Sequence, residues 1–193
     1  MNAIKQYLKI YQNGISLDLI SAILNEYKNC DDWMPTGIKH NDGNIYVDKS
    51  FRDTETILLS RQDVLSKNQT TRTQIDGLIF EALTAAINNY IVEMKLQNLL
   101  HISKDTGYEL LKYKTGGFFK EHTDSFDGNS RILSCSIALN DDYDGGEWSF
   151  FGGAEKFKAP AGSITIFPSN FMFPHEIQKV TSGIRYSIVT WFN

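Results

Sequence analysis

The sequence has few of the residues that crosslink a fold or bind structural metals. Its 193 residues include two cysteines, Cys30 and Cys135, which lie far apart in unrelated contexts. Neither a disulfide framework nor a cysteine-based zinc site is therefore indicated. The absence of disulfides favours a reducing compartment, and a chain of this length can bury a sizeable core without crosslinks.

Long apolar runs and basic clusters are also missing. No uninterrupted apolar run approaches the roughly 18 residues that span a bilayer, and the N-terminus lacks the pattern of a signal peptide. We therefore expect a soluble, cytoplasmic protein with no membrane partner. Lys plus Arg number 19 against 23 Asp plus Glu, a net charge of −4. Nucleic acid is accordingly not expected as a partner, and no oligomeric state is predicted.

The first half of the chain carries helical patterns. Ser16 is placed to cap a first helix, whose apolar positions are Leu17, Ile20, Ile23, Leu24 and Tyr27. Thr71 or Thr73 introduces a longer helix, with an apolar stripe that should pack along a sheet: Ile75, Leu78, Ile79, Leu83, Ile87, Tyr90, Ile91 and Met94. Residues 29–50 are polar and rich in turn signals, which predicts a surface loop, and residues 54–59 form a short β-type run.

The second half changes to short β-type runs separated by glycines. These runs are residues 108–113, 118–122, 132–139, 148–151, 163–167 and 185–192. No helical pattern interrupts them, and such a series predicts a sandwich, a jelly roll or a barrel. We expect one α+β domain over residues 1–193, in which residues 1–104 form a helical support region.

One pair of residues suggests a metal site. His122 and Asp124 leave the same face of an extended chain, because side chains alternate with period two. An imidazole and a carboxylate suit a divalent metal, and a third ligand would complete a facial triad with open positions. His40 and Asp42 have the same spacing but lie in the polar loop, where nothing holds them rigid, so a structural role is expected there and His40→Ala should be silent.

The context of His122 is more specific than the pair. Residues 113–124 read YKTGGFFKEHTD, and they are followed by Asp144-Gly145-Gly146-Glu147, Pro160-Ala161-Gly162-Ser163, His175, Arg185-Tyr186-Ser187 and Trp191. In this order the segments resemble the 2-oxoglutarate- and Fe(II)-dependent dioxygenases, most closely the prolyl 4-hydroxylase-like branch. The resemblance covers residues 105–193 well and the N-terminal half more loosely. It implies a double-stranded β-helix, the jelly-roll barrel of that family, over residues 105–193, with the N-terminal helices packed on one sheet.

The resemblance implies a metal centre. His122, Asp124 and His175 match the family's iron ligands, and three protein ligands leave positions for 2-oxoglutarate and O2. The implied cofactor is Fe(II), with 2-oxoglutarate and O2 as co-substrates and ascorbate as a further candidate cofactor.

It also implies residues that hold the co-substrate. Arg185, on the last expected strand, matches the family's basic residue for the distal carboxylate of 2-oxoglutarate, which a guanidinium binds bidentately. Tyr113 matches a tyrosine whose hydroxyl reaches the same carboxylate. Ser187, two strand positions from Arg185, points the same way and is a weaker candidate.

Substrate residues are implied less firmly. Arg131 and Trp191 match positions that line the substrate groove in peptide hydroxylases of this branch. Two departures bear on the substrate: Trp148 follows Gly-Gly-Glu where collagen-type members often have threonine, and Phe119 stands where they often have tyrosine. A prolyl residue of a protein or peptide is the first expected substrate, and free proline or another small molecule is the second. The nucleic-acid demethylase branch carries a second arginine where this chain has Trp191, which disfavours that branch.

Other interpretations stay open at this stage. Arg185 also suits a structural ion pair, Tyr113 and Trp191 suit a core, and Arg131 suits a solvated strand end. A cupin-like barrel would bind a metal without oxygen chemistry, and a β-sandwich interaction module would make the triad accidental. Arg185 is the residue that distinguishes a dioxygenase from a plain metal-binding barrel, which has no need of a cation facing the metal.

Overall fold

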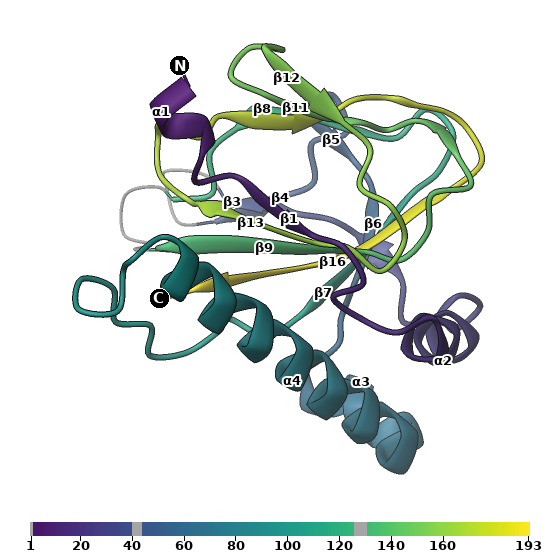
Figure 1. Ribbon diagram of the computed structural model, residues 1–193. Coiled ribbons are helices and arrows are strands. Elements are labelled where there is room, and N and C mark those ends of the chain that lie inside the picture. The colour runs from purple at the N-terminus through teal and green to yellow at the C-terminus, as the bar shows by residue number, and fades with distance from the viewer. Residues whose placement is uncertain (1, 40–43, 126–130) are drawn as a thin grey trace.

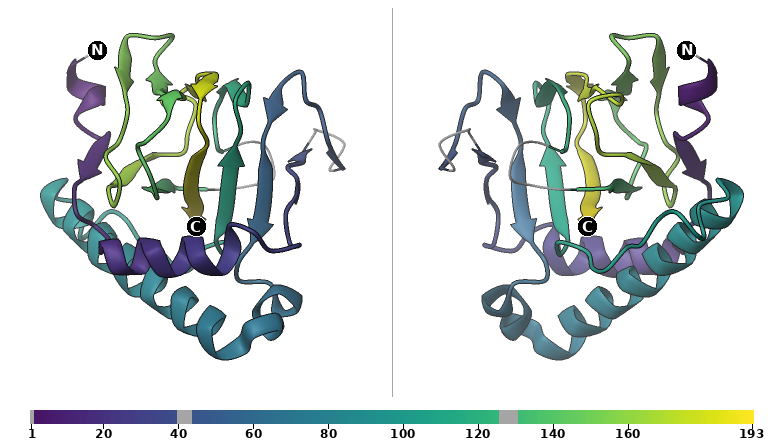
Figure 2. Two further views of the ribbon diagram at one scale, coloured as in Figure 1. Left: turned by 90° about the vertical axis from the view of Figure 1, so that its right-hand side faces the viewer. Right: turned by 90° about the vertical axis from the view of Figure 1, so that its left-hand side faces the viewer.

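Two antiparallel sheets face each other, and helices cover the outer face of the larger one (Figure 1). The computed structural model describes residues 2–39, 44–125 and 131–193. The His40/Asp42 pair lies outside the described residues. Figure 2 shows the strands standing on one side of α2 and α4, so the fold has three layers: helices, large sheet and small sheet.

The larger sheet has seven strands. Their spatial order is β1 (Lys9–Tyr11), β13 (Ile164–Pro168), β9 (Leu133–Ala138), β16 (Arg185–Phe192), β7 (Glu109–Tyr113), β6 (Glu55–Leu58) and β2 (Met34–Pro35). The central strand β16 pairs with β9 and β7, which places Arg185 opposite Tyr113.

The smaller sheet has five strands. Their order is β12 (Glu155–Phe157), β11 (Trp148–Phe150), β14 (His175–Ile177), β8 (Phe118–His122) and β5 (Arg52–Asp53). Two further pairs are β10 (Asp144–Gly145) with β15 (Val180–Ser182) and β3 (Ile38–Lys39) with β4 (Ile45–Tyr46). The jelly-roll fold expected from the sequence is confirmed, but among the described strands the two sheets do not close into a barrel.

The helices pack through the predicted stripes. Helix α2 (Leu17–Tyr27) begins where the Leu19 amide donates to Ser16 Oγ at 3.1 Å, as expected for a cap. The long helix α4 (Gln69–Glu93) starts earlier than predicted, because α3 (Gln62–Leu65) and a 3₁₀ turn, η1 (Ser66–Asn68), lead into it. A short helix, α1 (Asn2–Lys5), precedes β1.

Alternation along β16 separates two cores. Tyr186, Ile188 and Phe192 join the core between the large sheet and the helices, which also contains Ile79 and Leu83 of α4. The opposite face of the sheet meets the small sheet through a second core, made of Leu111, Tyr113, Trp148, Phe150, Phe167, Phe173, Ile177 and Val180. A strand exposes alternate residues to opposite faces, so Arg185, Ser187, Val189 and Trp191 lie on the face toward the small sheet.

Three expectations from the sequence need correction. The polar segment 29–50 is not only a loop, since β2 pairs with β6 in the large sheet and β3 pairs with β4. The region 1–104 is not only helical, because β1, β2, β5 and β6 supply strands to both sheets. Leu78 was assigned to the buried stripe of the long helix but is 40% exposed. Backbone pairing with distant strands, which polar sequence patterns do not reveal, accounts for the first two differences.

The segment Gln62–Glu93 is long and apolar enough to cross a membrane by length and composition alone. Its buried residues, among them Ile75, Ile79 and Leu83, pack in the core against the large sheet. This packing is typical of the core helix of a layered domain.

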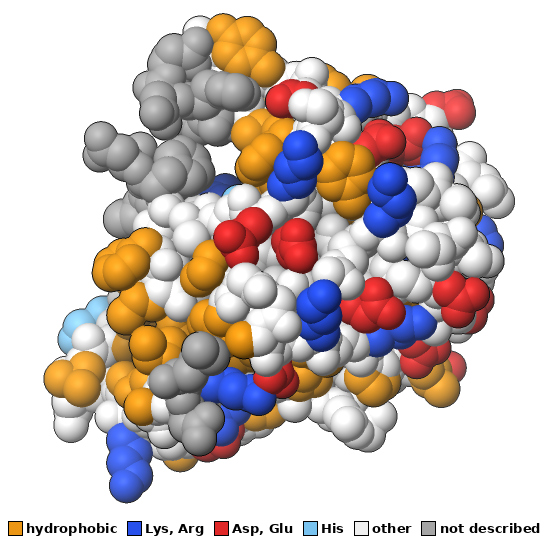
Figure 3. Space-filling model, turned by 90° about the horizontal axis from the view of Figure 1, so that it is seen from above, with side chains coloured by type: hydrophobic (Ala, Val, Ile, Leu, Met, Phe, Trp, Pro, Cys, Tyr) orange, Lys and Arg blue, Asp and Glu red, His pale blue; other side chains and the backbone are white. Residues whose placement is uncertain are grey.

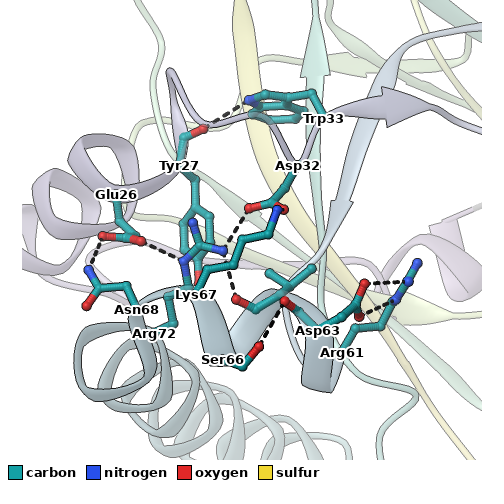
Figure 4. A network of polar contacts seen from close by, with 11 residues as sticks. Glu26, Tyr27, Asp32, Trp33, Arg61, Asp63, Ser66, Lys67, Asn68 and Arg72 are labelled. Carbon is teal, nitrogen blue, oxygen red and sulfur yellow. Dashed lines mark hydrogen bonds and ion pairs between the residues drawn. The ribbon is translucent and has the colours of Figure 1, made fainter.

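A buried arginine joins the helices to the chain that follows α2 (Figure 4). Arg72 of α4 donates from Nε to Glu26 at 2.6 Å and from Nη1 to Asp32 at 2.7 Å and to the Val64 carbonyl at 2.8 Å. Lys67 also contacts Asp32. Burial alone would raise the pKa of Asp32, but the hydrogen bonds from Lys67 and Arg72 hold it below its ordinary value.

We predict that Arg72→Ala lowers the free energy of unfolding by about 3–5 kcal/mol, since it leaves buried carboxylates without their cation. Arg61→Ala is the matched control, because Arg61 pairs with Asp63 at the surface and such pairs contribute at most about 1 kcal/mol. Urea titration of both variants measures the difference. The deficit of Arg72→Ala should shrink as the pH falls toward about 4, where carboxylates protonate. Equal losses in both variants would contradict the assignment.

Candidate metal and co-substrate site

Strand pairing brings the three predicted metal ligands together. Strands β8 and β14 pair antiparallel with His122 opposite His175, and Asp124 follows two residues after His122. One possible ligand atom from each of the three residues lies within 4.8 Å of the others. This is the one such cluster of His, Cys, Asp and Glu in the part of the chain that the structure describes.

Both imidazole rings are oriented by the carbonyl group of the residue two positions earlier in the chain. His122 Nδ1 lies 2.8 Å from the Lys120 carbonyl oxygen, and His175 Nδ1 lies 3.0 Å from the Phe173 carbonyl oxygen. These contacts require a proton on Nδ1, which leaves Nε2 with a lone pair. Each Nε2 lies 3.6 Å from an oxygen of Asp124, so the lone pairs and the carboxylate converge.

Two serines fix the carboxylate, and sequence analysis missed both. Ser134 Oγ donates to Asp124 Oδ2 at 2.6 Å and lies 2.8 Å from Ser169 Oγ. Ser134 is on β9, whose alternate residues Ser134 and Ser136 are polar and buried. The signal in the sequence was the pair Ser134 and Ser136 in an otherwise apolar strand, since polar groups that become buried there need hydrogen-bond partners.

Burial sets the charge state of the site. It lowers the pKa of His175 to about 4, with His122 adding to the effect, so this imidazole is neutral at neutral pH. Burial would raise the pKa of Asp124, but His175, His122 and Ser134 together hold it well below its ordinary value. A neutral imidazole and an ionised carboxylate are the forms that bind a divalent metal. The oriented lone pairs and this donor set fit Fe(II).

Aromatic rings surround the two histidines. The Phe119 ring stacks on His122 with centroids 3.6 Å apart. Phe167 and Phe150 lie 4.8 and 5.3 Å from His175. Such walls keep water away from the ligands and lock their rotamers.

The predicted co-substrate residues lie next to one another. Arg185 is 3% exposed and its Nη1 donates to Ser187 Oγ at 2.9 Å. Its guanidinium carbon lies 5.1 Å from the centre of the Tyr113 ring and 5.6 Å from that of Trp148. No ion pair joins Arg185 to a carboxylate of the described residues, so the structural ion pair considered from the sequence is not formed there.

Tyr143 is a residue of this region that sequence analysis missed. Burial raises the pKa of its hydroxyl, and the nearby charge of Arg185 opposes that rise. Tyr143 comes directly before Asp144 and Gly145 in the glycine-rich turn that carries part of the family resemblance, which was the available signal.

The inner cavity at the triad is small. It has a volume of about 30 Å³, and its lining includes the triad, Tyr113 and Trp148 but not Arg185. A space of this size holds water rather than a dicarboxylate. The Trp148 ring lines this cavity and its centre lies 5.6 Å from the Arg185 guanidinium carbon, so a dicarboxylate that joined the triad to Arg185 would require side chains here to move.

The two predicted substrate residues are in contact on the other side of the triad. The Arg131 guanidinium lies 3.6 Å from the centre of the Trp191 ring, and Arg131 Nη1 donates to the Asp124 carbonyl at 3.2 Å. Both side chains line an outer cavity of about 640 Å³ that also reaches His122 and Asp124. Away from this site, His101 is exposed and Cys135 is buried.

Comparisons with known proteins agree with this geometry. The family model of the 2OG-Fe(II) oxygenase superfamily matches residues 108–193. A PKHD-type hydroxylase of Prochlorococcus marinus (strain AS9601) is 30% identical over 178 residues, which is 89% of this chain and 72% of the relative. This chain belongs to the 2OG-Fe(II) oxygenase superfamily. The resemblance found in the sequence is thereby confirmed, and the iron and 2-oxoglutarate chemistry implied by the triad is that of its family.

Other relatives match over shorter stretches. A PKHD-type hydroxylase of Synechococcus sp. (strain JA-2-3B'a(2-13)) is 33% identical over 89 residues, which cover 41% of this chain and 39% of the relative. The match thus spans well under half the length of that protein.

Solved structures share the fold over the whole chain. A Pseudomonas putida prolyl-4-hydroxylase superposes with a TM-score of 0.70 and 19% identity over 100% of this chain and 98% of that one. A Trichoplax adhaerens prolyl hydroxylase, solved with a hypoxia inducible factor peptide fragment, superposes with a TM-score of 0.72 and 14% identity over 99% of this chain and 86% of that one. The two-sheet fold is therefore that of prolyl hydroxylases.

We predict that His122→Ala and Asp124→Ala abolish the binding of Fe(II), because two side chains rarely hold a divalent ion that three can bind. Iron retained after anaerobic loading and desalting should fall from about one equivalent to near zero. His101→Ala is the control, since His101 is exposed and far from the cluster in sequence. Wild-type iron retention by either ligand variant, with the fold intact, would refute the assignment.

Proposed function

We propose that this protein is an Fe(II)- and 2-oxoglutarate-dependent dioxygenase that hydroxylates a C–H bond, with succinate and CO2 as co-products. The observation that carries the proposal is the convergence of His122, Asp124 and His175 at one point, together with Arg185 on the facing sheet, which forms no ion pair with the described residues. A cupin-like metal site would not require such a cation, and a plain interaction module would require neither feature.

Each ligand has a defined task in this proposal. His122 and His175 would bind iron through Nε2, because their Nδ1 atoms are engaged with carbonyls. Asp124 would bind through a carboxylate oxygen while Ser134 holds it in place. The bound metal supplies the activation of O2 that couples the decarboxylation of 2-oxoglutarate to hydroxylation.

The co-substrate would be held by side chains on the face of the large sheet that is directed toward the small sheet. Arg185 would bind the distal carboxylate, and Ser187, which accepts a hydrogen bond from its guanidinium, would fix its orientation together with the nearby Tyr143. Tyr113 would add its hydroxyl. A charged donor held by neutral acceptors keeps its affinity for an anion, which it would lose in an ion pair.

The substrate would enter through the outer cavity. We favour a prolyl residue of a protein or peptide, because the fold is shared with prolyl hydroxylases, one of them solved with a peptide. The Arg131–Trp191 platform beside the triad offers a flat surface for a pyrrolidine ring. Free proline or another small molecule is the second candidate. Action as a single cytoplasmic domain, and any use of ascorbate, remain predictions from the sequence.

The distribution of charged side chains on the face shown in Figure 3 bears on the kind of partner that this protein binds. Lys and Arg side chains are interspersed there with Asp and Glu side chains, and no continuous basic surface forms on that face. A mixed surface of this kind gives little electrostatic attraction for a nucleic acid backbone. A peptide or protein partner therefore fits this face better than nucleic acid does.

We predict that purified protein releases succinate from 2-oxoglutarate only with Fe(II), and that Arg185→Ala raises the KM for 2-oxoglutarate roughly 30-fold or more, as expected when a buried charge partner is removed. Arg61→Ala, an exposed and paired arginine, should leave this KM unchanged. Succinate is measured by mass spectrometry, together with a gain of 16 Da on proline-containing peptides.

Under anaerobic conditions, iron with 2-oxoglutarate should give a charge-transfer band. Metal binding without that band would favour the cupin-like alternative.

A further inference from the structure

The outer cavity has a second wall that the assignments above leave without a role. It is bounded by β2, the β3–β4 hairpin, β5, β6 and the end of β8. The cavity of about 640 Å³ is large enough for several groups of a substrate. The Arg131–Trp191 platform occupies only part of its lining.

Three polar side chains on this wall have atoms without a hydrogen-bond partner among the described residues. They are Thr36 Oγ1, Arg52 Nε and Thr56 Oγ1, and the three residues are 4%, 8% and 4% exposed. All three residues line the outer cavity. Buried donors that lack a partner are rare and costly in native proteins, so a partner from outside the chain is indicated.

The three residues lie on or next to short strands that border the outer cavity. Arg52 lies on β5 and Thr56 on the following strand, β6. Thr36 follows β2, whose Met34 is opposite Thr56, and the Thr36 amide donates to the Thr54 carbonyl at 3.0 Å. Strands β2 and β6 pair at the edge of the large sheet and β5 is the edge strand of the small sheet, so the two hydroxyls and the guanidinium reach the cavity from the edges of the two facing sheets.

Arg52 lies close to the metal ligands. Its guanidinium carbon is 4.4 Å from the centre of the Phe119 ring, and the centre of that ring is 3.6 Å from that of the His122 ring. Arg52 also lines the inner cavity. A substrate group bound to Arg52 would thus lie about one aromatic ring away from the metal.

The other charges of the cavity leave Arg52 uncompensated. Arg61 is engaged with Asp63, and Asp124 is a proposed metal ligand. Glu109 is the other acidic residue of the lining, and no ion pair joins it to Arg52 in the described ranges. Burial raises the pKa of Glu109, and the charges of Arg52 and Arg131 oppose that rise, so this one carboxylate faces two guanidinium groups. A buried guanidinium without a carboxylate partner favours an anion from outside the chain.

We propose that Thr36, Arg52 and Thr56 form a subsite for a carboxylate of the substrate. A guanidinium binds a carboxylate through two parallel hydrogen bonds, and two hydroxyls can donate to its remaining lone pairs. This inference rests on the proposed function and defines its substrate class as an acidic one. The carboxylate comes either from an acidic side chain beside the hydroxylated residue or from the free carboxyl group of a terminal or free amino acid.

The test uses peptides with one fixed proline and randomised flanking residues. The protein is loaded with Mn(II) and 2-oxoglutarate, so that it binds peptides without turning them over. It is then used to capture peptides from two libraries, one with blocked ends and one with free C-termini. Bound peptides are sequenced by mass spectrometry, and free L-proline is tested as a competitor. At least tenfold enrichment of Asp and Glu over Asn and Gln at one flank is expected if a side chain supplies the carboxylate. Enrichment confined to free C-termini, or competition by L-proline, identifies the terminal group.

Isosteric variants tie the preference to these residues. Thr36→Val and Thr56→Val remove unpartnered hydroxyls while keeping the side-chain shape, so folding should be unaffected or improved. Each should reduce the affinity for carboxylate-bearing peptides roughly tenfold and leave that for matched amides unchanged. Arg52→Gln should abolish the preference, and Arg52→Lys should restore part of it. Thr190→Val is the control, because Thr190 Oγ1 is also buried and unpartnered but does not line the cavity.

Two failures can be told apart. Capture with no dependence on a carboxylate, no capture at all, or a preference that survives both valine variants and Arg52→Gln would overturn the subsite. Succinate release without peptide reports on the proposed function separately. If that release is absent while carboxylate-dependent capture persists, the dioxygenase activity is wrong and the subsite stands.

Discussion

The site depends on one interaction, the antiparallel backbone pairing of β8 with β14. This pairing sets His122 opposite His175, and each ring is then oriented by the carbonyl two residues earlier in the chain. A slip of one residue would turn one imidazole to the other face of the sheet. The register of two short strands is therefore as important to the proposed chemistry as the identity of the ligands.

Side-chain alternation in the large sheet places the apolar core on one face and the residues of the proposed site on the other. One face, with Tyr186, Ile188 and Phe192, binds the helices through an apolar core. The other face presents Ser134 to Asp124, the proposed metal ligand, and Arg185 to the region expected to hold the co-substrate. Because the helices anchor the back of the sheet, the polar groups on its front can be buried without the flexibility that loops would introduce.

Three buried arginines show how the partner of a cation indicates its role. Arg72 is paired with Glu26 and Asp32, away from the cavities at the triad, and we assign it to stability. Arg185 has hydroxyl partners and aromatic neighbours, and Arg52 lies over a single aromatic ring. A buried cation that has no carboxylate from its own chain retains the capacity to bind one from a ligand. The two arginines without carboxylate partners are those that we assign to the co-substrate and the substrate.

The sequence by itself determined the family, the strand-rich second half and the three side chains that form the metal cluster. It could do so because period-two alternation and the order of short motifs are local properties of the chain. Only the tertiary structure decided which side chains surround those residues: Ser134 donates to Asp124 from another strand, Tyr143 lies close enough to Arg185 for that charge to lower its pKa, and Arg52 lies over Phe119 from a strand far away in sequence. Strands β2 and β5 were hidden for the same reason, since their pairing is determined by distant partners and leaves no period in a polar segment.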